Sequence, residues 1–255
     1  MQRRHARRRL ILLLLFLLAL LLLWPRTVHL EGLVSPHAIL VDTDSGEVVA
    51  EKKADASIYP ASMTKMMTAV LALEQLRPDG QVAIRTDAAN TEDCPLGIVK
   101  GDVFTRDEIV GGMLMFSDNG AAVALADSID GSVPAFAKRM NARAKELGME
   151  HTHFVNCTGL PADGHVTCAM DIALMSRALL SHELIRRYTG IWMDSLRNGT
   201  FGLSSTNKLV RYYEGCTGLK TGFTTSAGFC ISATAKRNEL ELIAVVLGAK
   251  TSKDR

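Results

Sequence analysis

Two patterns of apolar residues occur along this chain, one typical of strands and one typical of helices. Short apolar runs typical of strands cover residues 38–42 and 47–50 near one end, and 217–222, 228–233 and 240–247 near the other. Between them, apolar residues recur at the three-to-four-residue spacing of helices that bury one face. We therefore expect an antiparallel sheet built from both chain ends with an inserted helical lobe, an α/β (α+β) arrangement.

The expected helices have clear start and stop signals. One begins near Pro60, which suits a first helical turn, and ends at the turn formed by residues 77–80. Ser132 is expected to cap a helix that runs to about Leu147 and is followed by Gly148. The pattern also predicts helices at 106–116, from 121 onward with Asp118 or Asn119 as its cap, and at 169–180, while 81–104 is mixed, 151–168 is a loop and 201–210 is irregular.

The N-terminus predicts export. Five arginines between Arg3 and Arg9 precede an unbroken apolar run from Leu10 to Trp24, and no small-residue cleavage site follows this run. We expect residues 1–30 to form a signal peptide or, by a slight preference, a signal anchor in the membrane. The arginines then stay in the cytoplasm, and a domain formed by residues 31–255 lies outside the cytoplasmic membrane.

Charge and cysteine content narrow the class further. The formal net charge of +2 becomes −3 when the five N-terminal arginines are set aside, so nothing favours nucleic-acid binding. The five cysteines fit no disulfide framework, and we expect mostly free thiols, with Cys157 and Cys168 the one pair worth considering.

The start of the first expected helix carries candidate chemistry. Ser62 and Lys65 are three residues apart, so their side chains lie on one helix face. A serine hydroxyl becomes a good nucleophile only when a base takes its proton, and a neutral lysine one turn away is placed to do so. Burial and a second nearby cation would favour that neutral form, and Lys220 is the candidate neighbour, expected itself to stay charged.

Three motifs in order make this reading specific. Ser62-Met63-Thr64-Lys65 is followed by Ser117-Asp118-Asn119 and then by Lys220-Thr221-Gly222. Each motif alone is weak, but the ordered set is the signature of class A β-lactamases and penicillin-binding proteins. The motifs also fall at an expected helix start, an interhelical loop and a strand.

The chain resembles the low-molecular-mass penicillin-binding proteins, which are serine-type D-alanyl-D-alanine carboxypeptidases. The resemblance runs from about residue 38 to 255 and includes residues 59–65, 153–156, 159–161, 165–167, 171–173, 206–209 and 218–224. It implies a β-lactamase/transpeptidase-like fold. Family members usually continue past the residues matching 252–255 into a closing helix, and many add a β-rich domain. We therefore expect a truncated catalytic domain with one sheet face uncovered. Many members also have Gly where this chain has Asp118.

The resemblance implies removal of the terminal D-Ala from a peptidoglycan stem peptide that ends in D-Ala-D-Ala, with β-lactam antibiotics as inhibitors. Ser62 would attack, Lys65 would accept its proton, and Ser117 would relay a proton to the leaving amine. Substrate contacts are expected from Asn119, Lys220, Thr221 and Gly222, and an oxyanion hole from the backbone N–H groups of Ser62 and Phe223. No cofactor or metal is expected.

Two other functions stay open. A class A-like β-lactamase would need a deacylating glutamate, and neither Glu146 nor Glu150 has the usual Leu-Asn after it. A non-enzymatic penicillin-sensing or peptidoglycan-binding module would have no need of Lys65. A zinc site is disfavoured because the His and Cys residues at 151, 153, 157, 165 and 168 match no standard zinc spacing.

Overall fold

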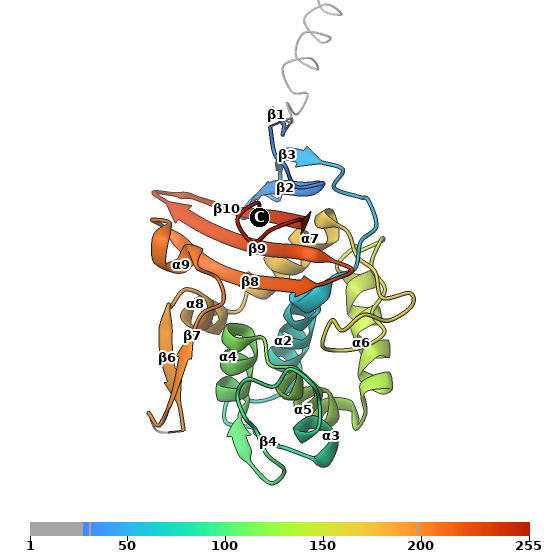
Figure 1. Cartoon of the computed structure of the whole chain (residues 1–255), viewed down its shortest axis with the longest axis vertical. Coiled ribbons are helices and arrows are strands. Elements are labelled where there is room, and N and C mark those ends of the chain that lie inside the picture. Colours follow the sequence, from blue (N-terminus) through green and yellow to red (C-terminus); the bar gives the residue numbers. More distant parts are fainter. Residues whose placement is uncertain (1–27, 31, 198) are drawn as a thin grey trace, which may run out of the picture.

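A six-stranded sheet forms one end of the molecule, and a helical lobe packs beneath it (Figure 1). The structure, a computed structural model, describes residues 28–30, 32–197 and 199–255. The strands follow the order β1-β3-β2-β10-β9-β8, antiparallel except for the β1–β3 pair. Their bounds are β1 Val28–His29, β2 His37–Asp42, β3 Val48–Lys52, β8 Cys216–Thr224, β9 Gly228–Arg237 and β10 Leu240–Ala249.

Pairing between the two chain ends closes the sheet. Strand β10 lies between β2 from the N-terminal part and β9 from the C-terminal part, with Val245 opposite both Ile39 and Ser232. The predicted antiparallel sheet from both ends is therefore confirmed. The short strand β1 pairs with β3, so the sheet starts inside the stretch predicted to be the N-terminal signal segment.

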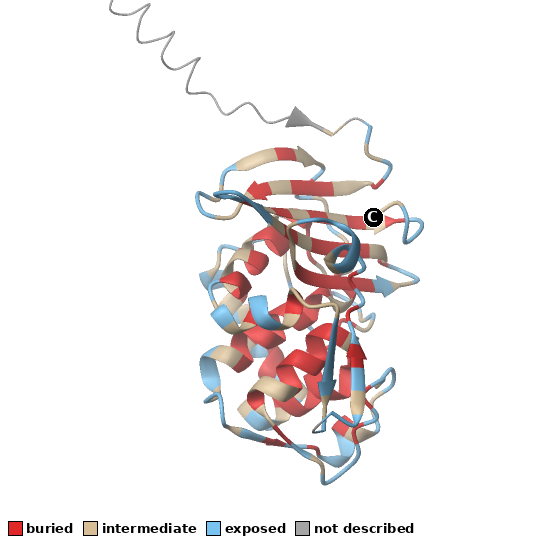
Figure 2. Cartoon of the chain, turned by 90° about the vertical axis from the view of Figure 1, so that its left-hand side faces the viewer, coloured by how far each residue is buried: buried red, intermediate tan, exposed pale blue. Residues whose placement is uncertain are grey.

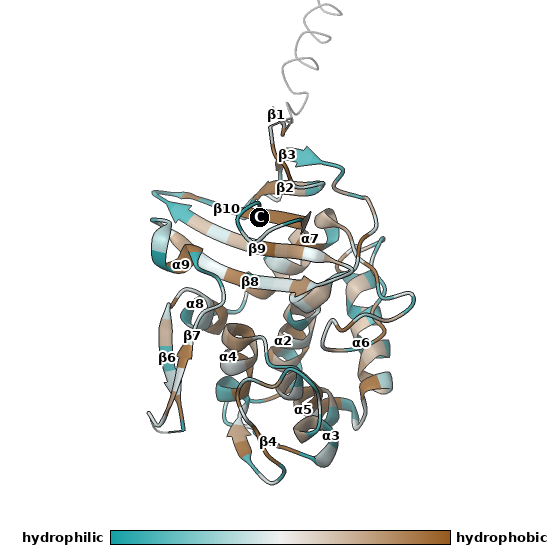
Figure 3. Cartoon of the chain, viewed as in Figure 1, coloured by the Kyte–Doolittle hydropathy of each residue, from teal (hydrophilic) through white to brown (hydrophobic). Residues whose placement is uncertain are grey.

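The helical lobe is organised around one buried helix. A 3-10 turn, η1 (Ala61–Met63), leads into α2 (Thr64–Gln75), whose residues from Thr64 to Ala72 are all buried. Figure 2 shows this burial along the inner helices and strands, and Figure 3 shows that hydrophobic residues predominate on them. Around α2 lie α4 (Arg106–Phe116), α5 (Asn119–Asp130), α6 (Val133–Glu146) and α7 (Ala169–Leu180).

Local capping explains where these helices begin. Thr105 and Glu108 form a reciprocal capping box at the start of α4. Asp118 caps α5 by accepting from the Ala121 N–H, and Ser132 caps α6 by accepting from that of Ala135. The predicted bounds of α4 and α7 are confirmed, as is the end of α6, where Gly148 has a left-handed φ of +76°.

Several small elements lay outside the sequence prediction. Residues 201–210, expected to be irregular, contain β7 (Phe201–Ser204), which pairs with β6 (Met193–Leu196), and α9 (Leu209–Tyr212). Such short segments carry too few residues for a period to be visible. The remaining elements are β4 (Gln81–Ala83), α3 (Thr86–Ala89), β5 (Val103–Thr105) and α8 (Glu183–Thr189).

The two faces of the sheet differ in burial. On β10, Ile243, Val245 and Leu247 are fully buried on the side where α7 packs. The alternate residues Leu242 and Ala244 are only half-buried and line an open hollow with Tyr213. One face of the sheet is thus partly exposed in the described chain.

Candidate active site

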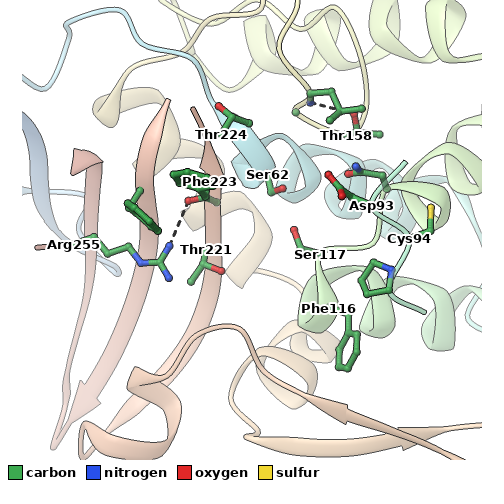
Figure 4. A pocket seen from close by; sticks show the side chains of 16 residues that line it. Ser62, Asp93, Cys94, Phe116, Ser117, Thr158, Thr221, Phe223, Thr224 and Arg255 are labelled. Atoms are coloured by element: carbon green, nitrogen blue, oxygen red, sulfur yellow. Dashed lines mark hydrogen bonds between the residues drawn. The ribbon is translucent and has the colours of Figure 1, made fainter. Parts of the chain in front are cut away.

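A cleft of about 760 Å³ opens between β8 and the helical lobe (Figure 4). The predicted residues Ser62, Ser117, Asn119, Thr221, Gly222 and Phe223 all line it. They come from η1, from the junction of α4 and α5, and from strand β8, which are far apart in the sequence. The three motifs therefore meet in one place, and Lys65 and Lys220 lie directly behind the lining.

The backbone around Ser62 is held in an unusual conformation. Ala61 has a left-handed φ of +48°, and η1 turns Ser62 into the cleft ahead of α2. In Figure 4 the Ser62 side chain faces that of Ser117 across the cleft. A left-handed residue just before a candidate nucleophile is the kind of strained backbone that surrounding structure must support.

Lys65 is anchored beside Ser62. Its side chain is fully buried, and its Nζ donates to Ser62 Oγ at 3.1 Å, to Asn119 Oδ1 at 2.5 Å and to the Thr158 carbonyl at 2.6 Å. These contacts point the amine at the Ser62 hydroxyl, as the Ser-x-x-Lys spacing predicts. The sequence had not singled out Thr158, whose carbonyl is an additional anchor.

Ser117 and Asn119 flank the cap of α5. Ser117 ends α4 with a φ of +63°, and Asn119 is almost fully buried. The Asn119 side chain accepts from Lys65 and donates to the Glu92 carbonyl at 3.0 Å. Between them, Asp118 is buried and accepts from the Leu96 N–H at 2.9 Å as well as capping α5. Asp118 therefore fixes the loop between α3 and β5 to the start of α5.

Strand β8 supplies the opposite wall. Lys220 is buried, and its Nζ donates to Ser117 Oγ at 2.9 Å and to the Thr221 carbonyl at 2.7 Å. The Thr221 hydroxyl donates to Thr206 Oγ1 at 2.8 Å. Each serine of the site thus has a lysine amine beside it, Lys65 for Ser62 and Lys220 for Ser117.

Gly222 has a packing reason in addition to the expected one, which stays a prediction. We expected it to let a substrate backbone lie close to the strand. In the structure a Cβ at this position would lie 3.0 Å from the Ser62 backbone nitrogen and 3.2 Å from Ala61 Cβ. The absence of a side chain therefore allows β8 to pack directly against the Ala61–Ser62 backbone. The neighbouring Phe223 is half-exposed at the rim and packs on Phe229.

Arg255 is a cleft residue that the sequence analysis did not single out. It lines the cleft beside Phe229, and its Nη1 donates to the carbonyls of Gly222 at 3.4 Å and Cys230 at 3.2 Å. A signal for it existed, since the Ser252–Arg255 stretch was part of the resemblance. Its guanidinium adds a second cation to the β8 side of the cleft.

Burial shifts the pKa of both lysines downward. Desolvation lowers the pKa of Lys65 to about 8, although Asp118 and Asp93 oppose the shift. The pKa of Lys220 falls well below its usual range because of burial and of repulsion by Lys65 and Arg255. The direction for Lys65 agrees with the expected base. The pKa of Lys220 moves in the same direction, so its expected charge stays a prediction that depends on a bound carboxylate.

The loop of residues 153–166 supports Ser62 from behind. A Cβ on Gly159, which has a φ of +90°, would lie 1.8 Å from the Ala61 carbonyl oxygen. We expect Gly159→Ala to displace the Ala61–Ser62 backbone and to slow acylation by penicillin at least tenfold, because small misplacements of a reacting group are costly. Acylation rates measured by intact-mass spectrometry test this.

Gly164→Ala is the matched control. Gly164 also has a left-handed φ of +78°, but a Cβ there would meet no atom within 4 Å. The control shares the backbone strain and lacks the clash, so it should acylate at nearly the native rate. Equal rates for the two variants would remove the proposed support role of Gly159.

His165 holds the same loop together. Its Nδ1 accepts from the Val155 N–H at 2.9 Å, which places the ring proton on Nε2 for donation to Thr64 Oγ1, also at 2.9 Å. Burial lowers the pKa of His165 to about 4. Both ring nitrogens are occupied by protein partners, and no group of three His, Cys, Asp or Glu side chains in the described ranges is arranged to hold a metal.

The buried His165 gives a pH prediction. Folding depresses the pKa of this histidine from about 6.5 in the unfolded chain. Its contribution to stability is therefore fully present above pH 6.5 and is lost as the pH falls towards 4. At about 1.4 kcal/mol per pKa unit, up to roughly 3 kcal/mol of unfolding free energy is at stake. Urea unfolding at pH 7, 6, 5 and 4 should show a steeper acid loss for the native chain than for His165→Gln. Exposed His151→Gln should keep the native slope, and identical slopes in all three would contradict the prediction.

All five cysteines are free in the structure, which agrees with the sequence expectation and leaves the considered Cys157–Cys168 bridge unformed. Burial raises the pKa of each of these two thiols to about 12. Both are therefore packed as neutral thiols.

Sequence comparison identifies relatives of this chain. Residues 25–251 match the family model described as D-alanyl-D-alanine carboxypeptidase. The chain is 40% identical over 226 residues to the D-alanyl-D-alanine carboxypeptidase DacF of Bacillus subtilis, covering 86% of this chain and 58% of that protein. It is 34% identical to DacC of Escherichia coli, covering 85% of this chain and 57% of that protein. The chain thus spans less than two thirds of these relatives' length.

Solved structures agree with the family model. Penicillin-binding protein D2 from Listeria monocytogenes, in its ampicillin-bound form, superposes with a TM-score of 0.79 at 34% identity, over 88% of this chain and 94% of that one. The carboxypeptidase DacD from Francisella tularensis gives a TM-score of 0.79 at 28% identity, over 91% and 69%. These matches confirm the β-lactamase/transpeptidase-like fold expected from the sequence. With the family model matching most of its length, this chain belongs to the D-alanyl-D-alanine carboxypeptidase family.

Proposed function

We propose that this chain is the catalytic part of a serine peptidase that removes the terminal D-Ala from peptidoglycan stem peptides ending in D-Ala-D-Ala. The reaction proceeds through an acyl-enzyme, and β-lactams acylate the same serine. The observation that carries the proposal is the 3.1 Å contact from buried Lys65 Nζ to Ser62 Oγ at the wall of the cleft. A lysine amine in this position serves as the general base for a serine nucleophile.

Acylation follows from this contact. Lys65, when neutral, takes the Ser62 proton while Oγ bonds to the carbonyl carbon of the penultimate D-Ala. The bond from that carbon to the leaving nitrogen then breaks. Ser117, beside Lys220 at 2.9 Å, delivers the proton that the leaving amine requires. Water later cleaves the Ser62 ester and releases the shortened peptide.

The substrate's ends are recognised by opposite walls. Lys220, Thr221 and Arg255 gather donors on the β8 side, where the terminal carboxylate binds. That carboxylate also supplies a counter-charge that favours protonated Lys220. The Asn119 side-chain oxygen accepts from Lys65, and its amide nitrogen donates one hydrogen to the Glu92 carbonyl; the other hydrogen meets no acceptor among the described residues and can donate to the substrate's backbone. The N–H groups of Ser62 and Phe223 form the oxyanion hole.

The predicted location belongs to the same proposal. We place residues 1–30 as a signal peptide or membrane anchor and residues 31–255 as the catalytic domain on the outer side of the cytoplasmic membrane, where peptidoglycan lies. Residues 1–27 lie outside the described part of the structure. In the part that is described, no helix is long and apolar enough to cross a membrane.

Release of D-Ala tests the function directly. The purified chain is incubated with a pentapeptide ending in D-Ala-D-Ala, and free D-Ala is measured together with the tetrapeptide by mass spectrometry. We expect equal amounts of both products. A matched peptide ending in L-Ala-L-Ala should release neither free alanine nor a shortened peptide. The absence of D-Ala release by a correctly folded chain would overturn the proposal.

The lifetime of a penicillin adduct separates the alternatives. A peptidase should lose its acyl group over minutes to hours, a β-lactamase rapidly, and a sensing module hardly at all. Glu146 is exposed and paired with Arg143, and Glu150 is exposed; neither lines the cleft, so neither is placed to deacylate as a β-lactamase glutamate does. The geometry therefore favours slow deacylation.

A further inference from the structure

The cleft has charges of opposite sign on its two sides. Lys220 and Arg255 lie on the β8 side, while Asp93 lines the other side on the loop between α3 and β5. In Figure 4 Ser62 lies between Phe223 and Asp93, with Arg255 beyond Phe223. Asp93 is the carboxylate among the cleft-lining residues, and no step of the proposed mechanism uses it.

The backbone of Asp93 is built into the active site. Its carbonyl accepts from the Asn119 N–H at 3.2 Å, and the preceding Glu92 carbonyl accepts from the Asn119 side chain at 3.0 Å. Asp93 itself has a left-handed φ of +55°. The loop therefore holds Asp93 at a fixed place relative to Asn119, so a substrate contact there would be directional.

The Asp93 carboxylate is available to a ligand. The residue is exposed, and within the described ranges its side chain takes part in no salt bridge or hydrogen bond. Asp102, further along the same loop, differs because it pairs with Arg197 at 2.9 Å. An unpaired carboxylate facing a substrate cleft is placed to attract a cation.

We propose that Asp93 makes this site selective for peptides carrying a free ammonium on the side chain of the residue before D-Ala-D-Ala. The inference rests on the proposed function. With the terminal carboxylate at Lys220 and Arg255 and the reacting carbonyl at Ser62, the upstream residues leave the cleft past Asn119. Asp93 lies on that path, and a lysine-length side chain can bring its ammonium to the carboxylate. The partner class is therefore a diamino-acid stem peptide with an unmodified amine.

Two peptides that differ only in one charge test the inference. Both are Lys-D-Ala-D-Ala with an acetylated α-amine; one keeps its ε-ammonium and the other is Nε-acetylated. From D-Ala release we expect kcat/KM to favour the free amine by roughly two- to fivefold at low ionic strength, as for an exposed ion pair. Added salt should shrink the preference.

Substitutions at Asp93 then assign the preference. Asn tolerates a left-handed φ well, so Asp93→Asn removes the charge while keeping the loop, and the ratio between the two peptides should fall to about one. Asp93→Lys should invert the ratio. Exposed Asp79→Asn, on the far turn after α2, is the matched control and should keep the native ratio.

The outcomes separate this inference from the function it rests on. Absence of D-Ala release from either peptide by the native chain would overturn the proposed function. Equal kcat/KM for both peptides with the native chain would overturn only the role of Asp93. An unchanged peptide ratio in Asp93→Asn, or an equal loss on both peptides, would likewise overturn it, because the carboxylate would then act on the loop or on the chemistry and not on the side-chain ammonium.

Discussion

Ser62→Ala should abolish covalent labelling by penicillin and reduce D-Ala release by at least about four orders of magnitude, as expected when the nucleophile of a covalent mechanism is removed. Intact-mass spectrometry after incubation with penicillin should show one adduct on the native chain and none on the variant. The expected loss is large because the proposed acyl-enzyme forms on Ser62 Oγ, and Ser117, the other serine with a lysine beside it, is assigned to the leaving amine.

The control must separate chemistry from folding. Removing the Ser62 hydroxyl leaves Lys65 bonded to Asn119 and to the Thr158 carbonyl, so the variant should fold with a melting temperature close to native. Ser181→Ala, at an exposed serine at the end of α7, should label like the native chain. An adduct that persists in Ser62→Ala would place the nucleophile elsewhere.

Lys65→Arg should reduce acylation by at least about a thousandfold, whereas Lys220→Arg should keep a measurable part of it. Arg retains the positive charge but does not release its proton, so it cannot replace Lys65 as a base. General-base catalysis of this kind contributes about 10²–10⁴ in rate. Lys220 is assigned to binding a carboxylate, which an arginine can still do with altered geometry.

The pH dependence of acylation distinguishes the base from a mere contact. Because the pKa of Lys65 is about 8, only its minor neutral form is reactive at pH 7. The acylation rate should therefore rise about tenfold per pH unit below 8 and level off above it, until loss of the Lys220 charge weakens substrate binding. Stopped-flow measurement with a chromogenic cephalosporin from pH 6 to 9 tests this. Near-native acylation by Lys65→Arg would show that Lys65 is not the base.

The sheet and the large helices were readable from the sequence because their signals are local. A short apolar run at residues 240–247 marked β10, and the helix pattern between Ser132 and Gly148 marked α6. The small elements α8, α9 and the β6–β7 pair were missed, because segments of four to seven residues are defined by tertiary contacts and not by their own period.

The sequence by itself determined the family: three ordered motifs match it as a set, and they predict the nucleophile, its lysine and the residues of β8. Only the tertiary structure decided how they work together. Burial, which no motif encodes, lowers the pKa of both lysines, and packing against the Ala61–Ser62 backbone requires a small residue at Gly222. The places of Thr158, Arg255 and Asp93 in the cleft depend on contacts between segments distant along the chain. Those contacts form only when the helical lobe closes against the sheet, so they have no local signature.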